Sequence, residues 1–239
     1  MGDVKTARAE LRRQAKSLRD QIESDEKKRK SDEVCRLVQA EVLKLLGGKA
    51  SVASFDGKSS ADVPLRLGVY SAFADEVNLD DLILWAYERG IDVSFPCMMK
   101  DAHGLEGCCE QTMEFRSVSK RDYLLTKGTL AGSGSTRKVE QVESEEGVPF
   151  LLHPLKKYAH DSVELSDQPY VSPDNLDFLV CPCVAFDGEG NRLGYGAGNY
   201  DRYLSQLTHC RVLGVAFSEQ CLDSIPVEEH DIPIDFVSA

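Results

Sequence analysis

Apolar residues in the first fifth of the chain recur at helical spacing. Between residues 3 and 46 they fall three or four positions apart, which predicts amphipathic helices. Ser24 followed by Asp25 is typical of a helix N-cap with an acidic first turn, so we expect two helices that separate near Ser24. We expect Gly47 and Gly48 to end the second helix.

The pattern then changes to short apolar runs. Residues 65–73 and 91–96 read as strands of a parallel sheet, and the helical segment 79–89 lies between them. Asn78 is suited to cap this helix and Gly90 to end it. The order strand, helix, strand predicts a β-α-β unit.

Further strands are expected in four places: residues 51–55, 112–116, 176–186 and 211–217. Strands that alternate with helices predict an α/β fold, with a mostly parallel sheet between two layers of helices. A length of 239 residues suits one domain over 1–239. Residues 127–161 are rich in glycine, serine and acidic residues, which predicts an inserted surface loop.

Composition narrows the class of protein. A net charge of −12 argues against nucleic acid as the main partner, and no apolar run is as long as a membrane-spanning helix. The N-terminal region has no apolar signal segment, so we expect a cytoplasmic protein. The eight cysteines include no CxxC pair, so we expect reduced thiols and no zinc site.

The most informative stretch is a glycine-spaced loop. Gly194, Gly196 and Gly198 follow the apolar run 176–186 and precede a helical segment near residue 203. A strand that leads through glycines into a helix can present backbone N–H groups to a phosphate. The spacing is neither GxGxxG nor GK[ST], and a turn that needs glycine for steric reasons alone is an equally good interpretation.

Charged side chains flank this loop and also lie on the first helix. Arg192 precedes the glycines, and Asp187 before them and Asp201 after them could hold a Mg²⁺ that accompanies a nucleotide. Arg8 and Arg12 are four residues apart, so they share a helix face and could bind a polyphosphate together. From the charges alone, a solvated basic face is the preferred interpretation of that helix.

The string AFDGEGNRLGYGAGNYDRYL, residues 185–204, resembles the C-terminal signature of the 5-formyltetrahydrofolate cyclo-ligase family. The segment Arg8-Ala9-Glu10-Leu11-Arg12 is similar to the family's N-terminal ATP-binding motif. The resemblance implies a fold of the NagB/RpiA/CoA-transferase type. It also implies ATP-dependent cyclisation of 5-formyltetrahydrofolate to 5,10-methenyltetrahydrofolate through a phosphorylated formyl group.

The resemblance also implies roles for individual residues. It implies catalytic roles for Arg192 and Tyr200, and a Mg²⁺ site at Asp201 and Asp231. The residues implied to bind ATP are Arg8, Arg12, Arg192, Leu193, Gly194, Tyr195, Gly196, Ala197, Gly198, Asn199 and Tyr200. The residues implied to bind the folate are Ser71, Phe73, Glu76, Tyr195, Gly196, Ala197, Gly198 and Asn199.

Several alternatives stay open at this point. Ala197 and Asn199 depart from the glycine or lysine and the aromatic residue that the family usually has. A relative that binds folate or nucleotide without turnover is therefore the second hypothesis, and an isomerase or acyl-transfer enzyme of similar fold is the third. The register of the basic pair relative to the family, the polyglutamate preference and the role of residues 127–161 are not fixed by the sequence. We expect a monomer.

Overall fold

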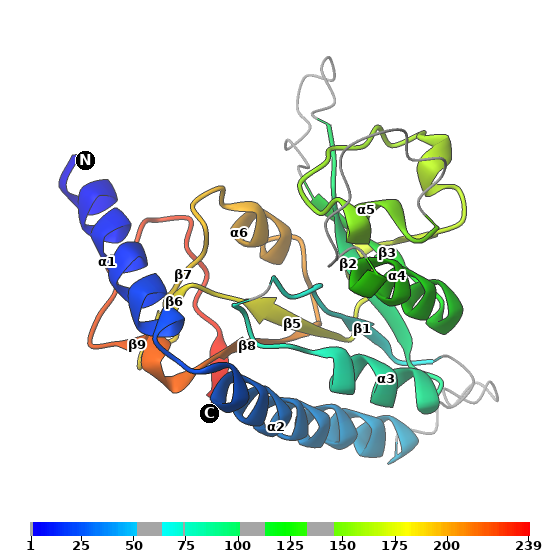
Figure 1. The fold of residues 1–239 in the computed structure, drawn as a ribbon, viewed down its shortest axis with the longest axis horizontal. Helices are drawn as coiled ribbons and strands as arrows, with labels where there is room; N and C mark the ends of the chain where they lie inside the picture. The colour runs from blue at the N-terminus through cyan, green and yellow to red at the C-terminus, as the bar shows by residue number, and fades with distance from the viewer. Residues whose placement is uncertain (1, 52–63, 74, 101–112, 133–145) are drawn as a thin grey trace.

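The computed structural model describes residues 2–51, 64–73, 75–100, 113–132 and 146–239 (Figure 1). Its elements in chain order are α1 (Gly2–Asp20), α2 (Ser24–Ser51), β1 (Arg66–Gly68), α3 (Asp80–Glu88), β2 (Asp92–Met98), β3 (Met113–Ser117), α4 (Lys120–Gly132), α5 (Pro149–Leu152), η2 (Val163–Leu165), β4 (Tyr170–Val171), η3 (Pro173–Asn175), β5 (Phe178–Pro182), β6 (Ala185–Asp187), β7 (Arg192–Leu193), α6 (Asn199–Leu204), β8 (Arg211–Ala216), η4 (Ser218–Gln220), β9 (Cys221–Leu222) and β10 (Asp235–Ser238).

The strands form two sheets. The larger sheet has seven strands in the order β10-β8-β5-β1-β2-β3-β4, and the smaller has three in the order β7-β6-β9. From β10 to β2 every neighbouring pair in the larger sheet is parallel, whereas β3 pairs antiparallel with both β2 and β4. The predicted α/β class with a mostly parallel sheet is therefore confirmed.

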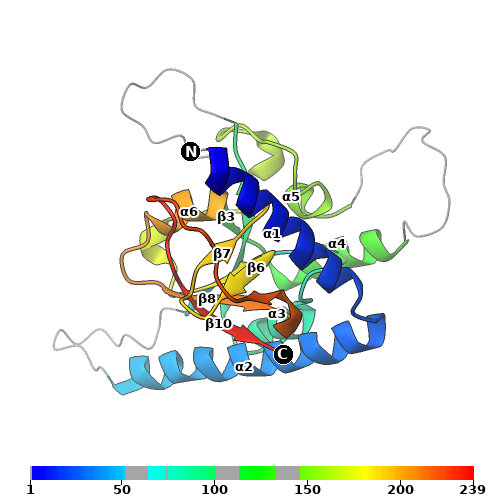
Figure 2. The ribbon, with the colours of Figure 1, turned by 90° about the vertical axis from the view of Figure 1, so that its left-hand side faces the viewer.

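Helices cover both faces of the larger sheet, as expected for a parallel sheet. Alternate residues of β5 show this most clearly. Val180 packs in the core that α2 and α3 contribute to, while Leu179 and Cys181 pack on the other face with Tyr203 of α6. Figure 2 shows α2 along one side of the molecule and α1 lying over β6 and β7.

The predicted first helical region is confirmed, with a break before Ser24. The expected end at Gly47 and Gly48 is wrong, because α2 continues to Ser51. Glycine ends a helix where its φ is positive, and that of Gly47 is not. The strand expected over 51–55 begins at this helical serine, and the rest of it lies outside the described residues.

The predicted β-α-β unit is confirmed by the parallel pairing of β1 and β2 on either side of α3. The carboxamide Oδ1 of Asn78 accepts a hydrogen bond of 2.7 Å from the N–H of Asp80 at the helix start. Gly90 follows the helix with a φ of 68°. The first strand is shorter than expected, because regular pairing ends at Gly68 and residues 69–73 have no regular secondary structure.

The apolar run 176–186 forms two strands instead of one. β5 belongs to the larger sheet and β6 to the smaller, and Cys183 and Val184 lie between them. The buried side chain of Gln220 donates hydrogen bonds to the carbonyl oxygens of Cys183 at 3.0 Å and Val184 at 2.9 Å. This amide replaces the sheet partners of the two carbonyls, so both carbonyl oxygens stay hydrogen-bonded where the chain leaves one sheet and enters the other.

The predicted surface loop over 127–161 is wrong at both ends. Helix α4 runs to Gly132, and residues 146–161 include α5, whose Phe150 and Leu151 are buried in the main core. The glycine and charge content concealed the apolar run at 148–152, whose burial in the core offsets the conformational entropy that the segment loses when it docks. Residues 133–145 lie outside the described part of the chain.

Candidate active site

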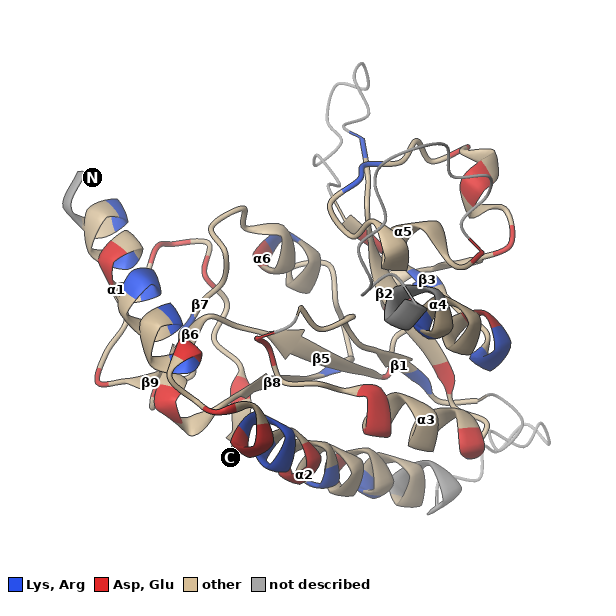
Figure 3. Ribbon diagram, in the orientation of Figure 1, with Lys and Arg blue, Asp and Glu red and all other residues tan. Residues whose placement is uncertain are grey.

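A cleft of about 640 Å³ lies where five segments meet. These segments are α1, the loop after β1, the region of α5, the glycine loop before α6, and residues 228–231. The strands β1 and β5 point their carboxyl ends towards it, which is where α/β sheets usually place ligands. Figure 3 shows Lys and Arg recurring along α1, the helix that forms one wall.

The glycine loop has the backbone freedom that the sequence predicted. Gly196 and Gly198 have φ values of 104° and 66°, in the region that favours glycine. Gly198 immediately precedes α6, which begins at Asn199. A Cβ built on Gly196 would lie 3.7 Å from Cζ of Arg12, so the loop and α1 approach each other closely here.

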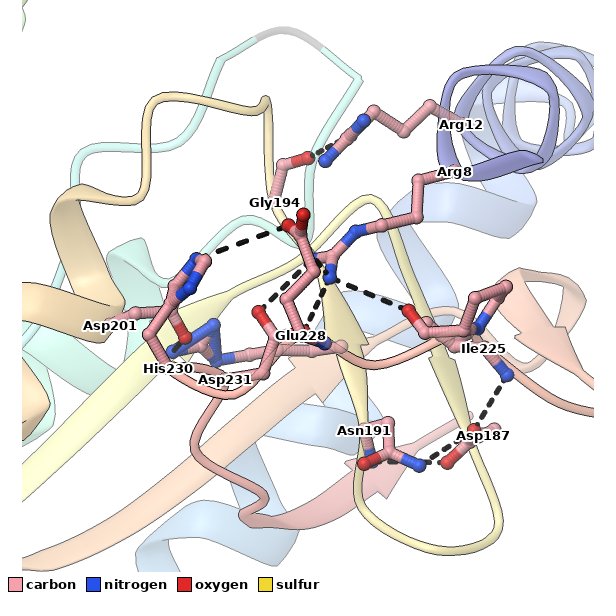
Figure 4. Close-up of polar contacts among 12 residues, drawn as sticks. Arg8, Arg12, Asp187, Asn191, Gly194, Asp201, Ile225, Glu228, His230 and Asp231 are labelled. Carbon is pink, nitrogen blue, oxygen red and sulfur yellow. Dashed lines mark hydrogen bonds and ion pairs between the residues drawn. The ribbon is translucent and has the colours of Figure 1, made fainter. Parts of the chain in front are cut away.

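A buried carboxylate holds the hairpin from which this loop emerges. Asp187 accepts hydrogen bonds from the N–H of Glu189, the N–H and side-chain amide of Asn191, and the N–H of Ile225 (Figure 4). Burial opposes the charge, but these four donors outweigh it and lower the pKa of Asp187. Asp187 does not line the cleft, so its role is structural and not the Mg²⁺ binding that the sequence allowed. It fixes the β6–β7 turn and joins it to the segment that follows β9.

The two arginines of α1 make different contacts. Nε of Arg12 donates a hydrogen bond of 2.8 Å to the carbonyl oxygen of Gly194. Arg8 is buried and forms a two-pronged ion pair with Asp231, and it also lies 3.4 Å from a carboxylate oxygen of Glu228 (Figure 4). Burial and the neighbouring Arg8 lower the pKa of Arg12, whereas the hydrogen bond to Asp231 raises that of Arg8.

The predicted metal ligands both line the cleft, and each contacts an arginine. Oδ1 of Asp201 lies 2.8 Å from Nη2 of the buried Arg192, and Asp231 is bound by Arg8. No cluster of three or more His, Cys, Asp or Glu suited to a metal occurs among the residues described. Two carboxylates are nevertheless adequate for Mg²⁺, because phosphates and waters supply its other ligands.

Glu76 lies at the opposite side of the cleft with both oxygens engaged. Oε2 accepts the N–H of Phe73 at 3.0 Å, and Oε1 accepts the hydroxyl of Tyr195 at 2.8 Å. Burial raises the pKa of Glu76 and that of Tyr195, the latter to about 12. The rings of Phe73 and Tyr195 meet edge to face, and the ammonium of Lys16 lies over the Tyr195 ring. Tyr195 thus connects the glycine loop to the loop after β1.

The cleft brings together nearly all of the residues singled out in the sequence. It is lined by Ser71, Phe73, Glu76, Arg8, Arg12, Arg192, Asp231 and every residue from Gly194 to Asp201. Leu193 is the exception. Its side chain is fully buried with Ala15 and Val184, because β7 turns it towards α1, so the predicted ATP contact does not hold for this side chain.

Tyr200 lines the cleft, and its hydroxyl is buried with no hydrogen-bond partner in the described part of the protein. Burial raises its pKa well above 10, so the phenol stays protonated at neutral pH. Asn199 does not offer a ring for stacking. Its Oδ1 accepts a hydrogen bond of 2.8 Å from Arg202, and its amide lies 3.8 Å from the sulfur of Met98.

The sequence interpretation missed two groups of cleft residues. Phe150, Leu151, Pro154 and Leu155 come from the segment assigned to a surface loop, and the apolar run at 148–152 was the signal that could have revealed them. Arg19 of α1 also lines the cleft, and its signal is its position seven residues after Arg12, which puts it on the same helix face.

These features define an α/β protein with a cleft that joins a glycine loop to an arginine-bearing helix. The model of the 5-formyltetrahydrofolate cyclo-ligase family matches residues 58–239, which is most of the chain. The chain therefore belongs to this family. The matched range leaves out α1, so the contact of α1 with the glycine loop is independent structural support for its place in the cleft.

Individual proteins with the name of this family are also similar to the chain. A probable 5-formyltetrahydrofolate cyclo-ligase of Caenorhabditis elegans is 25% identical over 99% of this chain and 94% of its own length. The 5-formyltetrahydrofolate cyclo-ligases of Mus musculus and Escherichia coli (strain K12) are 43% and 45% identical over 28% and 26% of this chain. These two matches span about a third of the relatives, 36% and 35% of their lengths.

Two solved structures share the fold. The 5,10-methenyltetrahydrofolate synthetase of Mycoplasma pneumoniae superposes with a TM-score of 0.57 at 18% identity, over 96% of both chains. That of Aquifex aeolicus has a TM-score of 0.53 at 23% identity, over 97% of this chain and 89% of its own. The predicted fold of the NagB/RpiA/CoA-transferase type is thereby confirmed.

Proposed function

We propose that the protein converts 5-formyltetrahydrofolate and ATP into 5,10-methenyltetrahydrofolate, ADP and phosphate. The observation that carries this proposal is the cleft itself. Arg12 of α1 meets the glycine loop at one side, Glu76 lies at the other, and Tyr195 spans the two. Membership of the family supplies the reaction, and the cleft supplies a place for both substrates.

The chemistry requires alignment and charge stabilisation more than a protein nucleophile. The formyl oxygen attacks the γ-phosphorus of ATP and the bond to ADP breaks, which turns a poor leaving group into a phosphate ester. A neighbouring folate nitrogen then attacks the formyl carbon and loses its proton to solvent, and phosphate leaves with the electron pair of its C–O bond. In this proposal Arg12 and the N–H groups of residues 194–198 would bind the phosphates and stabilise the charge that spreads over them, which the contact of Arg12 with Gly194 supports.

Arg8 would exchange its carboxylate partner for a phosphate oxygen, and Asp231 would then be free to bind Mg²⁺. Asp201 would be the second metal ligand, and Arg192 beside it would face the developing charge. When bound, the cation neutralises phosphate charge. These four residues form two ion pairs, so none of the four buried charges lacks a partner of opposite sign before the ligands bind.

Tyr200 serves as a hydrogen-bond donor in this proposal. Its raised pKa excludes a tyrosinate base at neutral pH, and its unpartnered hydroxyl is buried at the cleft. An oxygen of the substrate would satisfy the hydroxyl. Ser71 and Phe73 line the folate side with Glu76, whose carboxylate would accept N–H groups of the pterin ring.

A direct assay tests the proposal. Purified protein with Mg·ATP should turn 5-formyltetrahydrofolate into a product with the absorbance of the methenyl compound, with one ADP formed per product. Heat-denatured protein and a reaction without ATP are the controls. Tight folate binding without ADP formation would instead establish the non-catalytic binding protein, and absence of both would reject the proposed function.

The cellular setting is proposed as well. None of the helices in the described ranges could cross a lipid bilayer. We propose a monomeric cytoplasmic enzyme whose ligands are small molecules, and sedimentation together with fractionation of cells would test this.

A further inference from the structure

Arg19 is a buried cation at the cleft with unused donors. Arg19 is 1% exposed, and its Nη2 forms an ion pair with Asp75. Nε and Nη1 have no hydrogen-bond partner among the residues that the structure describes. Buried donors of a charged group are costly to leave unpaired, so such a group in a cleft calls for an explanation.

Arg19 belongs to a different end of the cleft from the phosphate-binding arginines. It is eleven positions beyond Arg8 on α1, which corresponds to about 16 Å along the helix axis. Arg8 lies at the end formed by residues 226–231, whereas Arg19 contacts the loop after β1 through Asp75. Its unpartnered donors therefore lie nearer to the loop that carries Glu76 than to the end of the cleft that Arg8 occupies.

The charges around Arg19 favour its cationic form. Burial alone would lower its pKa, but Tyr195 and Asp75 outweigh that effect and raise it. Glu76 is the next residue after Asp75, and its Oε1 accepts the hydroxyl of Tyr195. The loop after β1 and α1 thus place an acceptor carboxylate and a guanidinium with spare N–H groups next to each other.

We propose that Arg19 is a specificity-determining residue that binds the 4-oxo group of the pterin ring while Glu76 binds its N–H groups. This inference rests on the proposed function. The 2-amino-4-oxo edge of a pterin presents two donors, the 2-amino group and N3–H, directly beside one acceptor, the 4-oxo oxygen. A carboxylate beside a guanidinium is complementary to that order of groups. The ligand satisfies the donors that Asp75 leaves unused.

A purely structural role would make a different prediction. In that case Arg19 would act only by holding the loop through Asp75, and removing Asp75 would have the same effect as removing Arg19. The side chain of Asp75 is 37% exposed, so water can hydrate the variant Asp75→Asn. Asp75→Asn is therefore the matched control for Arg19→Met, which removes the donors and keeps much of the apolar stem.

The test is titration calorimetry of the wild type and both variants with 5-formyltetrahydrofolate and, separately, with Mg·ATP. We expect Arg19→Met to weaken folate binding at least tenfold with ATP affinity changed less than twofold. Asp75→Asn should weaken folate binding less than threefold. The retained ATP affinity also reports that the variant is folded, and Arg19→Lys, which keeps the charge for Asp75, replaces Arg19→Met if that variant does not fold.

A second measurement compares a 4-oxo folate with its 4-amino counterpart. The wild type should prefer the 4-oxo compound, and the preference should fall at least fivefold in Arg19→Met or Arg19→Lys. Equal folate binding by the wild type and the Arg19 variants, or an equal loss in Asp75→Asn, would overturn the inference and leave the proposed function standing. Absence of folate binding by the wild type would overturn both.

Discussion

Nε of Arg12 and the carbonyl oxygen of Gly194 are 2.8 Å apart, although the two residues are separated by 182 positions in the sequence. The contact joins the first helix of the chain to the glycine loop near its end. The same two segments carry most of the proposed ATP contacts. The contact therefore allows a direct test of whether the two act as one binding site.

Replacing Arg12 by methionine should raise the KM for ATP at least tenfold and change the KM for the folate much less. The reason is that a charged donor to the phosphates and the link to the loop are lost together. Steady-state kinetics with each substrate varied in turn measures both constants. Arg13→Met is the matched control, because the Arg13 side chain is 73% exposed and pairs with Glu10 away from the cleft. An unchanged KM for ATP in Arg12→Met would remove α1 from the nucleotide site.

Replacing Asp201 by asparagine should lower kcat at least a hundredfold, and extra Mg²⁺ should not restore it. Asp201 is a proposed metal ligand, and it also neutralises the buried Arg192. Loss of one partner of a buried ion pair costs about 3 kcal/mol, so the unfolding midpoint in denaturant should fall too. Near-normal turnover in Asp201→Asn would show that neither role is needed.

As the pH is lowered, folate affinity should begin to fall at a higher pH than it would if Glu76 had the pKa of an ordinary glutamate. Burial raises the pKa of Glu76 above its usual 4.5, and only the ionised carboxylate accepts the pterin N–H groups. Protonation therefore begins to weaken binding at a pH above 4.5, and the loss approaches tenfold per pH unit once the carboxyl is mostly protonated. Calorimetry between pH 5 and 8 measures this, and Glu76→Gln should bind weakly with a flat profile over that range. A wild-type profile as flat as that of the variant would contradict the role of Glu76.

Replacing Asp187 by asparagine should destabilise the protein by about 1–3 kcal/mol at neutral pH, because a neutral amide cannot accept all four hydrogen bonds. The pKa of Asp187 is lowered in the folded state, so its contribution is present above its ordinary value of 3.8 and is lost as the pH falls through the lower folded value. Denaturant unfolding at pH 7 and pH 3 should therefore show a smaller difference between variant and wild type at the lower pH. A difference that grows towards acid would contradict this assignment.

Gly196 and Gly194 of the loop differ in backbone conformation, and so in how well they tolerate a side chain. Alanine at Gly196 would have to adopt a φ near 104°, which costs about 1–3 kcal/mol, and its Cβ would approach Arg12. Gly194 has no positive φ, and a Cβ there meets no atom within 4 Å. Thermal unfolding should thus show a lower midpoint for Gly196→Ala and an unchanged one for Gly194→Ala. Equal midpoints for the two variants would show that the backbone at Gly196 relaxes freely.

The sequence was sufficient to predict those elements whose structure follows from the local pattern of residues. Helical spacing identified both N-terminal helices, and the β-α-β unit followed from alternating runs with Asn78 and Gly90 at the helix ends. The cleft residues near Gly196 were found because they form one continuous motif. Arg8 and Arg12 were found from their spacing together with the family resemblance.

Tertiary contacts decided the rest. The division of the run 176–186 into two strands depends on Gln220, which is far away in the sequence. The docking of Phe150 against the main core could not be inferred from a segment dominated by glycine and charge. The pairing of Arg8 with Asp231, and the unpaired donors of Arg19, are properties of side chains from distant segments and have no local signature.

Only a small apolar cluster anchors α1 among the residues that the structure describes. Ala15 and Leu11 pack with Val184, Ala185, Leu193, Leu222 and Ile225 in a small cluster that is separate from the cores of the larger sheet. Detachment of this helix would expose little apolar surface, so it should open at a lower free energy than global unfolding. Mild heating or low denaturant would then inactivate the protein while its central sheet is still intact.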